Sequence, residues 1–142
     1  MQPTHALRRT LLGLAAASLP LFAGTAHAAA EIGQPAPAFT AQGADGKPVS
    51  LAGFKGKTVV LEWTNHECPF VVKHYESGNI PQLQKEFTAK GAVWLQVISS
   101  APDKQGHVDG PSALKINGFR NAAPSGIVLD PDGKIGKAYG AQ

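Results

Sequence analysis

Cys68 is the residue in this chain best suited to chemistry, because it is the only cysteine among 142 residues. A single cysteine cannot close an internal disulfide, so its thiol must be free, pair with a partner or react. The ionised thiolate is both a nucleophile and a metal ligand. Two histidines, His66 and His74, lie close to Cys68 in the sequence and raise the question of a metal site.

A metal site is the weaker of these interpretations. Imidazole and thiolate suit copper or zinc, but a structural zinc takes four ligands. If the residues after Cys68 are helical, six residues turn through about 600°, which places His74 on a different side from Cys68. A dithiol Cys-x-x-Cys exchange is also disfavoured, because Asn65 and Val71 stand where its second cysteine would be. Exchange through a single thiol with a partner stays open.

The elements on either side of Cys68 decide whether its thiol is reactive. Residues 58–63 are β-branched and mostly apolar, which predicts a strand, a candidate for the centre of a sheet. Pro69 suits the first turn of a helix. Residues 69–90 are predicted as one helix, kinked at Gly78, with a resemblance to a capping box after the kink.

Cys68 therefore lies where a strand ends and a helix begins. Reactive groups of open α/β sheets gather at this end of the strands. The unpaired N–H groups and the dipole of a helix N-terminus favour an ionised thiol, so this placement indicates reactivity. A buried structural cysteine is the alternative.

The remaining segments predict an α/β domain. We expect a hairpin over 39–51 around Asp45-Gly46, strands at 92–99 and 127–129, a loop at 100–111, a helix at 112–119 and a tight turn at 130–133. Alternation of strands and helices favours a partly parallel sheet with helices on its faces. Trp63 and Trp94 are predicted as core, and His74 and Tyr75 as surface and helix packing.

The N-terminus has the layout of a secretory signal. Arg8 and Arg9 precede an apolar run over 11–23, and small residues follow at 26–28. We expect residues 1–28 to be a signal peptide, residues 31–142 to form one domain, and the product to be periplasmic or secreted without a stable membrane anchor. The two arginines hold two of the three net positive charges, which disfavours a nucleic-acid partner.

Three motifs in order carry a family resemblance. Gly33-Gln34-Pro35-Ala36-Pro37-Ala38-Phe39, the segment 63–75 with Asn65-His66-Glu67-Cys68-Pro69-Phe70-Val71, and the stretch 129–141 resemble peroxiredoxin-like redoxins of the alkyl hydroperoxide reductase and thiol-specific antioxidant group. The resemblance implies a thioredoxin-like fold, with a central mixed sheet flanked by helices. It also implies a thiol-dependent peroxidase that uses an external thiol reductant and needs no organic cofactor.

The same resemblance assigns roles at the site. Cys68 matches the peroxidatic cysteine that attacks a hydroperoxide, and Pro69 matches the proline that shields the sulfur and starts the helix. Asn65 falls where such proteins place Thr or Ser, and its amide is a candidate to orient the substrate.

Two departures from the family pattern bear on these expectations. Arg120 is not assigned to the arginine that peroxiredoxins place beside the thiolate. The chain also stops just before an expected Thr-Pro pair, so we expect the last strands and helix of the fold to be missing, and any resolving thiol to lie there or on a partner. A redoxin-fold module for thiol exchange, metal handling or binding remains the alternative.

Overall fold

A five-stranded mixed sheet forms the centre of the computed structural model, which describes residues 29–141. In space the strands follow the order β2-β1-β5-β4-β3. β3, β4 and β5 run parallel, whereas β1 is antiparallel to both β2 and β5. The strands are β1 (Thr40–Gly43), β2 (Pro48–Ser50), β3 (Val59–Trp63), β4 (Val93–Ile98) and β5 (Gly126–Leu129). The mixed sheet with helices on both faces confirms the predicted thioredoxin-like α/β class.

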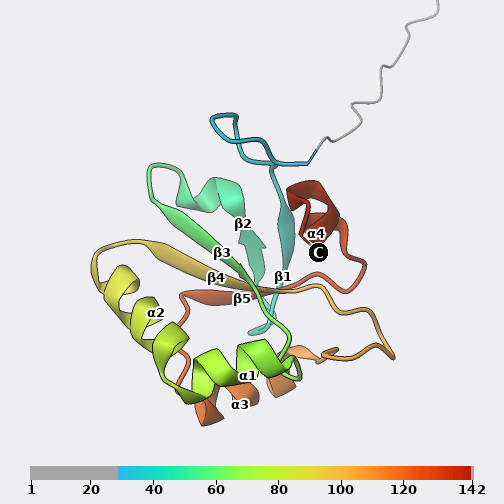
Figure 1. The fold of residues 1–142 in the computed structure, drawn as a ribbon. Helices are drawn as coiled ribbons and strands as arrows, with labels where there is room; N and C mark the ends of the chain where they lie inside the picture. Colours follow the sequence, from blue (N-terminus) through green and yellow to red (C-terminus); the bar gives the residue numbers. More distant parts are fainter. Residues whose placement is uncertain (1–28, 142) are drawn as a thin grey trace, which may run out of the picture.

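Helices cover the sheet on both sides (Figure 1). On one side lie α1 (Pro69–Glu76), α2 (Asn79–Ala89) and α3 (Gly110–Phe119), and on the other lie the short 3-10 helix η1 (Leu51–Phe54) and α4 (Lys134–Tyr139). No helix among residues 29–141 is long and apolar enough to cross a bilayer. The predicted signal peptide at 1–28 lies outside the described residues.

The single kinked helix predicted over 69–90 is wrong, because the chain forms two helices there. Gly78 adopts φ 75°, a left-handed conformation that glycine tolerates and that ends α1. Gly78 is also the N-cap of α2, without a side-chain capping bond. Asn79 is therefore the first residue of α2 and not the cap of a capping box.

β3 was predicted as a central strand, but it lies at the edge of the sheet. β4 is the strand whose six residues are all buried, and it separates β3 from β5. All five residues of β3 are only partly buried, as expected of an edge strand, so its apolar run does not mark it as central. The local pattern therefore predicted the strand correctly and its position in the sheet incorrectly.

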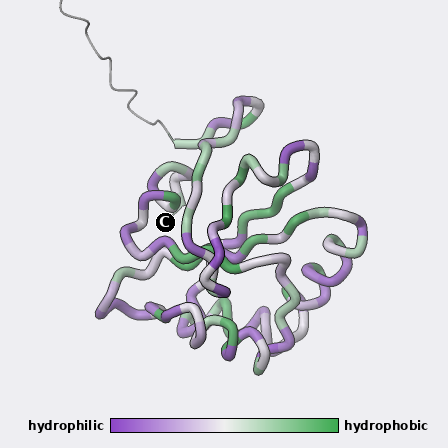
Figure 2. Tube along the Cα trace, turned by 180° about the vertical axis from the view of Figure 1, so that it is seen from behind, coloured by the Kyte–Doolittle hydropathy of each residue, from purple (hydrophilic) through white to green (hydrophobic). Residues whose placement is uncertain are grey.

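The sheet carries a separate apolar core on each face. One core joins Val93, Leu95, Val97 and Val128 to Ile135 of α4. The other joins Ile98 and Ile127 to Ala113 of α3 and to Ala44. Figure 2, which shows the fold from behind, has its hydrophobic tracts along the central strands. The two cores hold the carboxyl ends of β3 and β4 in a fixed position.

Gly110 packs so tightly that we expect Gly110→Ala to destabilise the domain. A Cβ at this position would overlap the backbone oxygen of Ala44, which cannot rotate away. We expect a loss of about 2–3 kcal/mol in the free energy of unfolding, measured by urea denaturation. A Cβ at Gly118 of the same helix would point into open space. Gly118→Ala is thus the matched control, expected to stabilise by about 0.5–1 kcal/mol. Equal stability of the two variants would contradict the prediction.

Candidate active site around Cys68

Cys68 is the N-cap residue of α1 and follows the last residue of β3 by a short connection. Its thiol is half-buried, and its side chain makes no capping hydrogen bond. The Cys68 N–H donates to the carbonyl oxygen of Asn65 at 3.0 Å, which closes a tight turn before the helix. Pro69 is the first residue of α1, as predicted, and is exposed. The sulfur is thus placed at the positive end of a helix with its lone pairs uncommitted.

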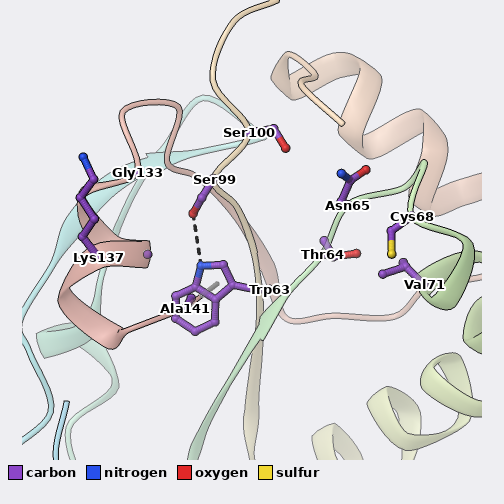
Figure 3. A pocket seen from close by; sticks show the side chains of 11 residues that line it. Trp63, Thr64, Asn65, Cys68, Val71, Ser99, Ser100, Gly133, Lys137 and Ala141 are labelled. Atoms are coloured by element: carbon purple, nitrogen blue, oxygen red, sulfur yellow. Dashed lines mark hydrogen bonds between the residues drawn. The ribbon is translucent and has the colours of Figure 1, made fainter. Parts of the chain in front are cut away.

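A pocket of about 530 Å³ opens beside the sulfur. Figure 3 shows Cys68, Asn65, Thr64 and Val71 on one side of this pocket and Lys137 on the opposite side. The structure therefore brings the predicted Cys68 and Asn65 together, whereas Pro69 is not among the lining residues. The lining residues are Trp63, Thr64, Asn65, Cys68, Val71, Ser99, Ser100, Gly133, Gly136, Lys137 and Ala141.

Asn65 organises the turn that carries Cys68. Its Oδ1 accepts the N–H of Glu67 at 2.9 Å, and its Nδ2 donates to the carbonyl oxygen of Gln105 at 3.4 Å. Glu67 Oε2 in turn accepts the N–H of Gly106 at 2.5 Å. These bonds tie the cysteine turn to the loop before α3. Because an amide nitrogen carries two hydrogens, one N–H of Asn65 remains for a substrate.

The far wall of the pocket is built on a buried carboxylate. Asp130 is 3% exposed and accepts the Ser99 hydroxyl at 2.6 Å and the N–H groups of Ile135 and Gly136 at 3.1 and 2.9 Å. Ser99 Oγ also accepts Trp63 Nε1–H at 3.2 Å, shown as the dashed line in Figure 3. Sequence reasoning predicted only a turn at Asp130 and missed Ser99. Trp63, predicted as core, both packs against the core and forms part of the pocket wall.

A second polar cluster lies behind α1, on the face of the sheet that α1, α2 and α3 cover (Figure 1). Glu62 of β3 accepts hydrogen bonds from Tyr75 Oη at 2.6 Å, from Gln84 Nε2 at 3.0 Å and from Trp94 Nε1 at 2.6 Å. Tyr75 and Gln84 are buried. Glu62 is therefore the common acceptor that joins β3 to both α1 and α2 and to β4. The sequence signal for it was one acidic residue inside an apolar strand.

This cluster continues to α3. Gln96 donates to the Tyr75 hydroxyl and accepts Asn117 Nδ2–H at 2.6 Å. Asn117 Oδ1 accepts Arg120 Nε–H at 2.9 Å, and the Arg120 guanidinium lies 3.7 Å above the Tyr75 ring. Arg120 thus contacts the back of α1 and is absent from the lining of the Cys68 pocket. Tyr75, predicted as helix packing, is the centre of this cluster.

The burial of Tyr75 makes the stability of the fold depend on pH. Burial, and next the hydrogen bond to Glu62, raise the pKa of Tyr75 well above its usual value. Above about pH 10 the unfolded tyrosine ionises while the folded one stays neutral, so stability falls by about 1.4 kcal/mol per pH unit. Below about pH 10 Tyr75 is neutral in both the folded and the unfolded protein, so its full contribution to stability is present.

We therefore expect Tyr75→Phe to flatten the alkaline decline in unfolding free energy, measured by urea denaturation from neutral to alkaline pH. Tyr139 is the only other tyrosine in the chain, and burial also raises its pKa. Tyr139→Phe is the comparison variant and should keep the part of the decline that Tyr75 causes. An unchanged decline in Tyr75→Phe would contradict this assignment.

The histidines near Cys68 do not gather around it. His74 Nδ1 is 3.0 Å from Asn79 Nδ2, and neither His66 nor His74 lines the pocket beside Cys68. Within residues 29–141 no three His, Cys, Asp or Glu side chains lie close enough together to hold a metal ion.

Comparison with known proteins places this geometry in a family. Residues 32–142 match the model of the AhpC/TSA family. No curated protein matches the chain significantly. Three solved structures illustrate the fold. The first is a secreted disulfide oxidoreductase of Mycobacterium tuberculosis homologous to E. coli DsbE, with 22% identity and a TM-score of 0.54 over 71% of this chain and 66% of that one. The second is an uncharacterized conserved protein of Geobacillus kaustophilus, with 21% identity and a TM-score of 0.66 over 75% of this chain and 56% of that one. The third is an exposed lipoprotein thioredoxin of Streptococcus pneumoniae, with 25% identity and a TM-score of 0.53 over 75% of each chain. The chain spans less than two thirds of the length of the first two.

Proposed function

Because the chain belongs to the AhpC/TSA family, as a redoxin of the thioredoxin superfamily, we propose that it is a thiol peroxidase whose nucleophile is Cys68. The observation that carries the proposal is the position of Cys68: a half-buried thiol at a helix N-terminus, without a hydrogen bond from its side chain, beside a pocket. Partial exposure combined with a helix N-terminus is the environment of reactive cysteines. Asn65 supports the site by holding the cysteine turn and by offering its remaining N–H to the peroxide.

The proposed reaction is a two-electron transfer at sulfur. The Cys68 thiolate attacks one oxygen of a hydroperoxide, the O–O bond breaks, and the other oxygen leaves as an alkoxide or hydroxide that takes a proton from solvent. Sulfur is thereby oxidised to a sulfenic acid and the peroxide is reduced to an alcohol or water. An external thiol then condenses with the sulfenic acid, which releases water and forms a mixed disulfide. A second thiol releases Cys68 in its reduced form.

Trapping of the sulfenic acid tests the proposal. The protein is treated with one equivalent of hydrogen peroxide in the presence of a sulfenic-acid trap, and the labelled residue is identified by mass spectrometry. We expect rapid labelling at Cys68, since the trap reports the oxidised sulfur directly. Protein alkylated at Cys68 beforehand is the control. Labelling no faster than that of a free cysteine, in protein shown to be folded by circular dichroism, would refute a peroxidase.

Exchange of a disulfide with a partner protein is the second candidate. Two of the three structural neighbours are described as a disulfide oxidoreductase and a thioredoxin, although such likeness supports only the fold. Phe70, two residues after Cys68, is 76% exposed and provides an apolar contact for a docking protein. Quantitative formation of a Cys68 mixed disulfide with an oxidised thioredoxin-type partner, without sulfenic-acid labelling, would favour this function over peroxide reduction.

We also propose that the protein is exported, with residues 1–28 as the signal peptide and residues 31–142 as the domain that acts outside the cytoplasm. The basic, apolar and small-residue order of residues 8–28 supports this proposal. Expression in a Gram-negative host should give a periplasmic product whose intact mass corresponds to a chain beginning at about Ala29. A full-length product confined to the cytoplasm would refute it.

A further inference from the structure

Thr64 carries a buried hydroxyl that lacks a hydrogen-bond partner. The residue is 7% exposed, and its Oγ1 is the one buried side-chain nitrogen or oxygen atom without a hydrogen-bond partner among the described residues. Its N–H donates to the carbonyl oxygen of Val97 at 3.1 Å, so the backbone is held by the sheet. Native proteins rarely leave a buried hydroxyl unpaired, because removing it from water without compensation costs free energy. The Thr64 hydroxyl therefore indicates a partner other than a protein atom.

A small, partly enclosed cavity lies against Thr64, which also lines the pocket beside Cys68. The volume that the centre of a water molecule can occupy in this cavity is about 10 Å³. Its lining includes polar residues from the cysteine turn and α3, namely Thr64, His66, Asn117 and Arg120. Figure 3 shows the Thr64 hydroxyl on the side of β3 where Cys68 and Val71 lie, opposite to Trp63.

We propose that one water molecule occupies this cavity and bridges Thr64 to Asn117 and Arg120. The volume is the minimum that one water needs, and a buried water requires two to four polar partners. Thr64 Oγ1 can donate or accept, and a carbonyl oxygen such as Asn117 Oδ1 accepts a second hydrogen bond besides the one from Arg120. The Arg120 guanidinium in the lining disfavours a metal cation, and the cavity is too small for an organic ligand.

The water makes Thr64 a positioning residue for Cys68. Thr64 directly follows β3 and starts the connection that leads to Cys68. Asn65 and Glu67 hold this connection through hydrogen bonds to the loop before α3, and Thr64 contributes the only hydroxyl to the lining of the cavity, which Asn117 of α3 also lines. A water bridge there joins the cysteine turn to the cluster of Asn117, Gln96 and Tyr75. This inference does not depend on the reaction that Cys68 performs.

A pair of variants tests the proposal. Thr64→Val keeps the shape and removes the hydroxyl, whereas Thr64→Ser keeps the hydroxyl. High-resolution crystal structures should contain an ordered water in the cavity of the wild type and of Thr64→Ser, and none in Thr64→Val. The thermal midpoint of Thr64→Val should fall by several degrees, and its Cys68 should be alkylated by iodoacetamide at a rate at least twofold different from the wild type. Thr64→Ser should restore the alkylation rate.

Each contrary result overturns a defined part of the inference. No density in the wild-type cavity, or a Thr64→Val protein more stable than the wild type, would mean that the cavity is dry. An ordered water in the wild-type cavity, together with an unchanged alkylation rate of Cys68 in Thr64→Val, would show that the water is present but that Thr64 does not position Cys68. If Thr64→Val does not fold, the density in the wild type and the alkylation rate of Thr64→Ser decide. None of these readouts uses peroxide, so failure here is distinguishable from failure of the proposed peroxidase function.

Discussion

Cys68→Ser is expected to abolish peroxide reduction while leaving the fold more stable than Cys68→Ala. Removal of a catalytic nucleophile lowers turnover by about a thousandfold or more, because the covalent step has no substitute. The Cys68 side chain makes no capping bond, so its loss removes no hydrogen bond from the fold. Serine is a preferred N-cap residue and should accept an N–H from the first turn of α1, which contributes about 1 kcal/mol relative to alanine.

The measurement is peroxide consumption with an excess of a small-molecule thiol, together with urea denaturation of the three proteins. Both variants should show only background consumption, and the serine variant should unfold at higher urea than the alanine variant. Activity within tenfold of the wild type in folded Cys68→Ser would show that the nucleophile lies elsewhere. Loss of activity together with loss of fold would be explained by structure alone, and the paired denaturation curves separate these cases.

Glu62→Ala is expected to destabilise the domain strongly, by about 3–5 kcal/mol. Glu62 accepts three hydrogen bonds, from Tyr75, Gln84 and Trp94, and its removal leaves the Tyr75 and Trp94 donors inside the protein without an acceptor, whereas Gln84 keeps its bond to the Tyr75 hydroxyl. Each buried donor left unpaired costs about 1–3 kcal/mol. The Arg120 guanidinium above Tyr75 also loses the nearby carboxylate that balances its charge.

Glu62→Gln is the matched control, because it keeps the shape and one carbonyl acceptor. We expect a smaller loss of unfolding free energy than in the alanine variant. Some loss remains because the NH₂ group of glutamine cannot accept the hydrogen bonds that the replaced carboxylate oxygen accepted. Urea denaturation at neutral pH measures both. A loss below about 1 kcal/mol in Glu62→Ala would show that water replaces the carboxylate, and the cluster would then contribute little to the position of α1.

Local sequence patterns correctly predicted the elements whose signals lie within a few residues. Asp45-Gly46 predicted the hairpin of β1 and β2, since Gly46 adopts the left-handed φ of 80° that such a turn requires. For the strand at 93–98 and the short strand at 126–129, the predicted ends differ from the observed ends by at most one residue. The helix at 112–119 begins two residues earlier, because Asp109 caps it by accepting the Ser112 N–H at 2.8 Å.

The sequence by itself thus determined the fold class, the position of Cys68 between a strand and a helix, and Pro69 as the start of that helix. Only the tertiary structure decided that β3 is an edge strand, that Glu62, Tyr75 and Gln96 share one cluster, and that Ser99 and Asp130 build the wall facing Cys68. The physical reason is range. Turn, cap and strand signals depend on residues that are close along the chain. Strand order and buried hydrogen bonds join residues that are tens of positions apart, and a local pattern does not specify which distant residue will be the partner.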